Sequence, residues 1–280
     1  MNNKPFSSKV RPVLFLTLLF LSHTALAENY QSSLNIYHST RNHTNYDADY
    51  TGISGIYYWS PIKPDRLLAE SAFLAKASGI SFSFAQISYD PGPVQLDGPG
   101  QSVSLSYVFR QQGIHIGMSS RTESLTGMGI KMDSDFSSFS IGRFFGDRLY
   151  ISLYHGTGTD TLTANPDIDS SSTGISIKRL TDNVNFEAGF SSDSYDDGSG
   201  VETNNEIGFS ADFYLENTFS IGLGFSNNRG DSKGIAGTTF SLNLRKFINT
   251  STSFGISYDS FSADSGNYSS TFYFSLSTRI

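Results

Sequence analysis

Residues 219–226 read Phe-Ser-Ile-Gly-Leu-Gly-Phe-Ser, with an apolar side chain at every second position and only serine or glycine between them. Successive side chains of a β-strand point to opposite faces, so this stretch predicts a strand with one apolar face. The other face of a strand in a soluble β-sandwich would carry Lys, Glu and Thr freely, whereas here it carries small residues. The pattern therefore favours a strand that meets lipid on one side and a wet interior on the other.

The same alternation recurs along the chain, and each repeat places Phe, Leu, Ile, Val or Tyr on one face. Small or polar residues, mostly Ser, Gly and Asn, occupy the opposite face. The clearest repeats are residues 102–110, 184–191, 206–213, 240–245 and 272–277. Many strands of this kind predict an all-β fold, either a membrane barrel or, less favoured by the small polar face, a soluble sandwich.

The segments that separate these strands alternate in length. Short turns are expected near residues 111–113, 146–147, 181–183, 216–217 and 249–250. Longer polar stretches are expected as loops at residues 91–101, 122–135, 156–171, 192–203, 227–233 and 261–267. Short periplasmic turns with longer extracellular loops are typical of a transmembrane antiparallel up-and-down β-barrel.

Strand direction permits a count, because a strand before a long loop runs outward and one before a short turn runs back. Residues 79–279 contain about twelve strands, and residues 31–39 and 50–59 add two, for an even total of about fourteen. Pro64–Ser78 does not alternate, and the spacing of Leu67, Leu68, Phe73 and Leu74 indicates a short helix or structured turn instead. The range of strand numbers that the pattern allows is about 12–16.

The N-terminus has the parts of a secretory signal peptide in order. Lys4, Lys9 and Arg11 are positive, residues 13–21 are apolar, and Ala25-Leu26-Ala27 is a small-x-small cleavage site. The apolar run is shorter than the roughly 20 residues that a spanning helix needs, which disfavours a membrane anchor. We therefore expect a signal peptide over residues 1–27 and an outer-membrane barrel over residues 28–280.

The composition agrees with export to the outer membrane and excludes several function classes. Only 16% of the residues are charged, against about 25% in soluble domains, and the chain holds 23 Phe, 15 Tyr and 26 Gly. There is no cysteine, so disulfides and thiolate metal sites are impossible. The net charge is −7, and it becomes −10 once Lys4, Lys9 and Arg11 are removed, which argues against a nucleic-acid partner.

One segment resembles a known family. Pro64–Ser78 reads PDRLLAESAFLAKAS, which is similar to the run P-L-A-E-A-A-F-L-x-x-A-S found early in a family of outer-membrane porins of Gram-negative bacteria. The resemblance covers these fifteen residues closely and the rest of the chain only as a strand pattern. It implies a passive barrel rather than an enzyme. The chain departs from the usual outer-membrane ending because its last residue is Ile280 and not Phe.

Charged residues on the small-residue faces are the candidate site residues. An Arg or Lys that faces lipid at the membrane midplane costs about 2–4 kcal/mol, so these side chains are expected to face the lumen. The pore-lining candidates are Arg110, His115, Lys178, Glu187, Glu206, Asp212 and Arg245. They would either line an open pore or close it by pairing across it, and the sequence leaves both options open.

No pattern predicts a catalytic or metal site. A barrel hydrolase would need a Ser activated by a His, and the mature chain offers His38, His43, His115 and His155 without a local signature. Aspartates cluster in the expected loops, for example Asp193, Asp196 and Asp197, but none has the spacing of a calcium loop. We interpret these aspartates as solvated loop residues favoured by turn chemistry.

The leading hypothesis is an outer-membrane channel for passive diffusion of small polar solutes or ions, with no cofactor and no catalytic residue. The alternatives are a non-conducting barrel that acts through its loops as an adhesin, receptor or structural protein, and a lipid-modifying barrel enzyme. The expected partners are outer-membrane lipid and lipopolysaccharide, the barrel-assembly machinery during biogenesis, and a second copy of the chain in a homo-oligomer.

Overall fold

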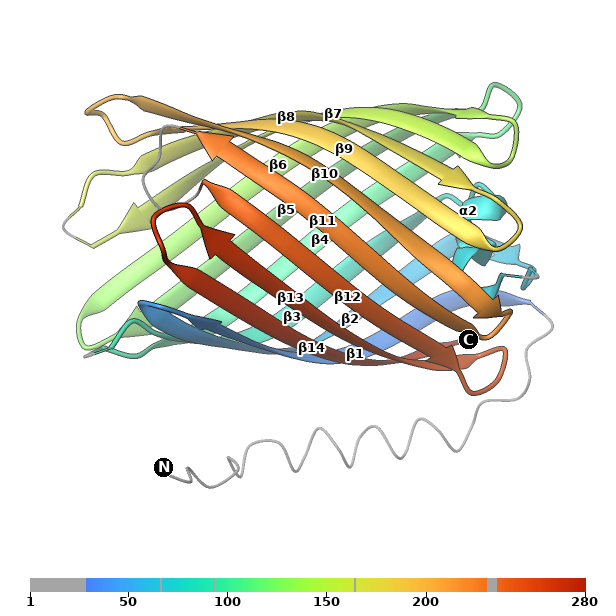
Figure 1. Cartoon of the computed structure of the whole chain (residues 1–280), viewed down its shortest axis with the longest axis horizontal. Coiled ribbons are helices and arrows are strands. Elements are labelled where there is room, and N and C mark those ends of the chain that lie inside the picture. Colours follow the sequence, from blue (N-terminus) through green and yellow to red (C-terminus); the bar gives the residue numbers. More distant parts are fainter. Residues whose placement is uncertain (1–28, 66, 93, 164, 231–235) are drawn as a thin grey trace.

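The computed structural model describes residues 29–65, 67–92, 94–163, 165–230 and 236–280 of the chain. These residues form one closed barrel of fourteen antiparallel strands, in which each strand pairs with its neighbours in sequence and β1 pairs with β14 (Figure 1). The predicted up-and-down barrel and its strand number are therefore confirmed. The signal peptide predicted over residues 1–27 lies outside the described residues.

The strands are 11–17 residues long, whereas a strand needs about 9–11 residues to cross a bilayer. Their bounds are β1 Tyr30–His43, β2 Tyr46–Ile62, β3 Gly79–Asp90, β4 Leu96–Phe109, β5 Ile114–Gly127, β6 Ile130–Phe145, β7 Leu149–Leu162, β8 Ile168–Leu180, β9 Val184–Asp196, β10 Val201–Glu216, β11 Phe219–Gly230, β12 Gly237–Phe247, β13 Thr252–Ala263 and β14 Tyr268–Arg279. Between β2 and β3 lie a 3-10 turn, η1 (Leu68–Glu70), and one α-helical turn, α2 (Ser71–Leu74).

The extra strand length changes one expectation about the loops. Residues 122–135 were expected to be a long loop, but β5 and β6 run through them and leave only Met128 and Gly129 as the turn. Most of the polar stretch at residues 156–171 is likewise strand. Serine, threonine and aspartate dominate these strand ends because they lie past the apolar band, where both faces meet water.

The outer surface carries a continuous set of exposed apolar side chains, here called the apolar belt. It includes Phe82, Phe84, Val103, Leu105, Met118, Phe139, Ile141, Leu153, Ile177, Phe186, Phe190, Phe209, Leu223, Phe225, Phe240, Phe272 and Phe274. Such a patch would be insoluble in water, since monomeric soluble proteins rarely expose more than a few hundred Å² of contiguous apolar surface. No helix within the described residues is long and apolar enough to cross a membrane.

The inner surface is made of the alternate residues, which are mostly Ser, Gly and Asn. Inward tyrosines lie over glycines of the adjacent strand, and these glycines have no room for a side chain. A Cβ added at Gly142 would lie 2.5 Å from the hydroxyl oxygen of Tyr150, and one at Gly174 would lie 2.5 Å from the Tyr154 ring. The glycines of the inner face therefore make space for rings inside the barrel.

Candidate functional site

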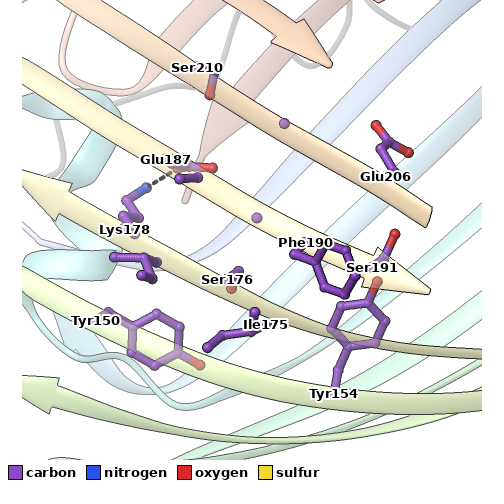
Figure 2. A pocket seen from close by; sticks show the side chains of 14 residues that line it. Tyr150, Tyr154, Ile175, Ser176, Lys178, Glu187, Phe190, Ser191, Glu206 and Ser210 are labelled. Carbon is purple, nitrogen blue, oxygen red and sulfur yellow. Dashed lines mark ion pairs between the residues drawn. The ribbon is translucent and has the colours of Figure 1, made fainter. Parts of the chain in front are cut away.

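The lumen is the candidate site, because its wall leaves space between small polar side chains. One cavity of about 470 Å³ follows the inner wall of β7–β10 and is lined by Tyr154, Lys178, Glu187, Glu206 and other residues (Figure 2). A second cavity of about 420 Å³ lies between β1 and β5, against Tyr37, Arg41, Tyr50, Arg121 and Glu123. Eight-stranded barrels are filled by side chains, whereas this wider barrel is not.

Residues 67–77, here called the inner segment, fold against the inner wall at the end of the barrel where the C-terminus lies (Figure 1). Leu67 is buried against Leu180 of β8 and Tyr214 of β10, which are the last inward residues of their strands. Ala69 and Ala72 line a third cavity of about 290 Å³ together with residues of β12–β14. The predicted short helix or structured turn therefore narrows the lumen rather than lying outside it.

Glu70 is the main polar anchor of the inner segment. Its side chain is only 8% exposed. Its Oε2 lies 2.8 Å from the Lys178 ammonium, and the Tyr214 hydroxyl donates a hydrogen bond of 2.7 Å to its Oε1. The Lys178 ammonium also lies 3.0 Å from the Glu187 carboxylate, as Figure 2 shows. A carboxylate with so little contact with water is stabilised only because both of its oxygens have partners.

Two further residues extend this network along the wall. Asn185 donates hydrogen bonds to Glu187 at 3.0 Å and to Asp212 at 3.4 Å. Asp212 in turn lies over Gly222 of β11, where any side chain would collide with its carboxylate. Three carboxylates and one ammonium are thus held side by side across β8, β9, β10 and the inner segment.

The remaining contacts fix the inner segment to opposite sides of the barrel. Phe73 packs on Phe144 with 5.4 Å between ring centroids, and the Lys178 ammonium lies 4.8 Å from the centroid of the Phe73 ring. Arg279 of the last strand donates a hydrogen bond of 2.6 Å to the carbonyl oxygen of Leu68. The segment therefore bridges β6, β8 and β14 and cannot move away from the wall without breaking all of these contacts.

Lys76 ties the end of the inner segment to the turn between β6 and β7. Its ammonium donates a hydrogen bond of 2.9 Å to Asp147. That hydrogen bond and the charge of Lys76 hold the pKa of the Asp147 carboxyl below its usual value. Because the folded pKa is lowered, this tie is present at neutral pH and is lost only as acid pH falls through the folded pKa of Asp147.

The predicted pore-lining residues fall into three groups. Lys178, Glu187 and Asp212 meet in the network around Glu70, whereas Glu206 and Arg245 line the first and third cavities. His115 lies on the inner wall, between the Ser106 hydroxyl at 2.9 Å and the Tyr150 hydroxyl at 2.7 Å. Its ring is thus held by two hydroxyl groups, and a third group of the carboxylate type, which orients the histidine of serine hydrolases, is not part of this contact.

Arg110 is placed differently from its prediction. It follows the last residue of β4 and lies exposed in the turn that leads to β5, so it is not part of the lumen wall. The alternation that indicated an inward position ends at Phe109, which pairs with Ile114 at the start of β5. Alternation with a period of two residues does not show where the strand ends, and the predicted strand was one residue too long.

Several lumen residues carry charge but were not predicted from the sequence. Arg41 hydrogen-bonds Thr271 at 3.3 Å, and Arg121 donates a hydrogen bond of 2.9 Å to Glu123. Glu123 fell inside the stretch expected to be a loop, while Arg41 lies two residues beyond the predicted end of its strand. Extending the alternation past the apolar band would have placed both on the inner face.

The fold and its two surfaces define the class of this protein. A closed antiparallel barrel with an apolar exterior and a polar interior satisfies all backbone hydrogen bonds in lipid and exposes no sheet edge. The chain is therefore an outer-membrane β-barrel protein, and the predicted location in the outer membrane of a Gram-negative cell is confirmed.

Comparisons with known proteins agree at the level of the fold. The crystal structure of the Acinetobacter baumannii outer membrane protein Omp33 matches with a TM-score of 0.55 at 16% identity, over 90% of this chain and 99% of that chain. A Pseudomonas aeruginosa FadL homologue matches with a TM-score of 0.54 at 8% identity, over 90% of each chain. OmpTdeltaL8, a loop deletion mutant of the Vibrio cholerae outer membrane protein OmpT, matches with a TM-score of 0.51 at 9% identity, over 90% and 99%.

No family model matches the sequence, and no curated protein matches it either. The barrel fold agrees with the resemblance of Pro64–Ser78 to a porin family. No group of three His, Asp or Glu residues within the described part of the chain is arranged to hold a metal ion.

Proposed function

We propose that this protein is a channel for passive diffusion of small polar solutes or ions across the outer membrane. The observation that carries the proposal is the unfilled polar lumen. Its wall is built from Ser, Gly and Asn, and cavities of about 470, 420 and 290 Å³ lie along it. A barrel whose only role was structural would gain stability from packing these spaces with apolar side chains, because each buried CH₂ group contributes about 0.8 kcal/mol.

In this proposal the inner segment narrows the channel rather than sealing it. It occupies one end of the lumen, and the third cavity passes beside Ala69 and Ala72, where small side chains leave room. The charged groups on the wall are the points at which ions or polar solutes exchange their hydration shell for protein contacts. The channel acts without a catalytic residue or a cofactor.

The alternative role as a loop-display protein finds less support in the geometry. At the end opposite the inner segment, the connections that the structure describes throughout are short. Thr44–Asn45 and Met128–Gly129 are two-residue turns, and the β9–β10 and β13–β14 connections span residues 197–200 and 264–267. Such turns offer little surface on which a partner could be recognised, since stable interfaces bury about 800 Å² on each side.

Single-channel recording in planar lipid bilayers tests the proposal. Purified, folded protein is expected to give stepwise currents, while the same protein unfolded by heat before addition is expected to give none. Heat-modifiable mobility on a gel confirms that the added sample is folded. A folded sample that produces no current would refute the channel function and would favour the loop-display role instead.

A further inference from the structure

The inner wall of the barrel is charged very differently in its two halves. In the half next to the inner segment, the inward charges of the strands balance once the buried Glu70 is included: Lys178, Arg245 and Arg279 are positive, and Glu70, Glu187 and Asp212 are negative. In the opposite half, the inward positions of the described strands carry two positive and six negative residues, a net charge of −4. They are Arg41, Arg121, Glu123, Asp160, Asp193, Glu202, Glu206 and Asp259.

Three of these acids lie on the inner face near the same rim and are here called the acidic wall: Asp160 of β7 and, on the far side of β8, Asp193 of β9 and Glu206 of β10. On β8, Ile168 pairs with Asp160, and Ser172, four residues along, pairs with Asp193. Asp193 pairs across the sheet with Asn204, which lies two residues from Glu206 on the same face of β10. Glu206 faces the first cavity, as Figure 2 shows.

The carboxylates of the acidic wall have no cation beside them, unlike those of Glu187 and Glu123. Glu187 has Lys178, and Glu123 has Arg121, each within 3.0 Å. Among the described residues, Asp160, Asp193 and Glu206 make no ion pair within 4.0 Å. Repulsion between three unpaired carboxylates is unfavourable, and a visiting cation would relieve it.

Asn204 supplies a second, independent sign of a ligand in this patch. The residue is only 1% exposed, and neither its Oδ1 nor its Nδ2 has a hydrogen-bond partner. The adjacent Asn228, which pairs with Glu206 on β11, also has an Oδ1 without a partner. A buried amide without partners costs about 1–3 kcal/mol, and a ligand that hydrogen-bonds to it would recover this cost.

Resting on the proposed channel function, we propose that the acidic wall makes the channel prefer small organic cations that carry an ammonium group. An ammonium has three N–H donors, which suit carboxylates and amide oxygens on one wall. Anions are repelled by the net charge of −4 before they reach the balanced half of the lumen. The acidic wall and Asn204 are thus specificity-determining residues for permeation.

Reversal potentials measured under a potassium chloride gradient test the cation preference. The wild-type channel is expected to select potassium over chloride, and the triple variant Asp160→Asn, Asp193→Asn, Glu206→Gln is expected to lose that selectivity several-fold. The matched control is Asp135→Asn, Asp169→Asn, Asp196→Asn, which makes the same charge change on outward positions near the same rim. The control is expected to leave the reversal potential unchanged.

Two further measurements separate the preference for cations over anions from the preference for ammonium over other cations. The selectivity is expected to fade in molar salt, because the Debye length shortens from about 10 Å at 0.1 M to about 3 Å at 1 M. Asn204→Leu keeps the charge and approximate volume. It is expected to lower the permeability of methylammonium relative to potassium, while the potassium-to-chloride ratio stays the same.

The outcomes that overturn the inference differ from those that overturn the channel. Absence of current in folded protein would overturn both the channel function and the cation preference. Current with no cation selectivity, or selectivity that the outward control changes as much as the acidic-wall variant does, leaves the channel and overturns the inference. Should the triple variant fail to fold, Glu206→Gln alone is expected to shift the reversal potential in the same direction, and an unchanged potential there also overturns it.

Discussion

Glu70 shows how a single side chain can control the shape of the lumen. It is buried between Lys178 and Tyr214, and it belongs to the inner segment rather than to the wall. Removing one member of a buried ion pair leaves the other charge without its partner and is strongly destabilising. Lys178 still keeps Glu187, so the loss at this site is smaller than for an isolated pair.

We expect Glu70→Gln to loosen the inner segment and to raise single-channel conductance. Glutamine can still accept the hydrogen bond from Tyr214, but it removes the charge that faces Lys178, at a cost of about 1–3 kcal/mol. Denaturant unfolding is expected to show this loss as a lower midpoint. The control is Glu216→Gln, since Glu216 also pairs with a lysine, Lys246, but lies exposed outside the lumen. Equal effects of the two changes would show that Glu70 does not hold the inner segment.

Sequence alone could not identify Glu70 as a site residue. Its partner Tyr214 is 144 residues away, and the contact exists only because the barrel closes. Lys178, Glu187 and Asp212 were predicted to face the lumen because they lie on strands, where the two-residue period fixes the direction of each side chain. Nothing comparable fixes the direction of a side chain in a segment of one helical turn.

At the scale of the element, the strands were predictable and their ends were not. The apolar belt enforces strict alternation inside the membrane, which is why residues 219–226 matched β11 so closely. Past the belt both faces are polar and the period disappears, so the sequence of the β5–β6 hairpin read as a loop. Its turn residues, Met128 and Gly129, both have positive φ, but Met-Gly lacks the Asn-Gly or Asp-Gly signature of such turns.

The register of β11 can be tested directly with two neighbouring substitutions. Leu223 is exposed on the apolar belt between Ala211 and Leu242, so Leu223→Arg places a charge in lipid at a cost of about 2–4 kcal/mol. Gly224 faces the lumen, where a Cβ would lie 3.2 Å from the Cβ of Ser241, and a small adjustment accommodates serine. We expect Leu223→Arg to reduce the folded fraction on a gel and Gly224→Ser to have a mild effect. Two equally harmless changes would contradict the register.

At the scale of the whole molecule, the size of the barrel, fourteen strands rather than sixteen, follows from the segment that is not a strand. Had Pro64–Ser78 formed two strands, the total would have been sixteen and the inner segment would not exist. Its helical spacing keeps the total at fourteen, and the chain ends pair with each other through β1 and β14. The same fifteen residues therefore set the barrel size and occupy the lumen that this size creates.

Closure of the barrel through β1 and β14 determines the state in which the protein is expected in the cell. We expect the mature chain to begin at Glu28, to fractionate with the outer membrane and to show heat-modifiable mobility on a gel. A closed barrel has no free sheet edge, so detergent cannot open it strand by strand and the folded form migrates differently until it is boiled.

A variant that lacks β14, truncated before Tyr268, is the matched control for closure. It keeps thirteen strands and the apolar belt outside β14. However, β1 and β13 each lose one of their two partner strands and become free sheet edges. We expect this variant to lose heat-modifiable mobility and to be recovered at low levels. N-terminal sequencing of the full-length protein that finds Met1 retained would contradict the cleavage. Recovery of that protein from the soluble periplasmic fraction would contradict the membrane location that the apolar belt requires.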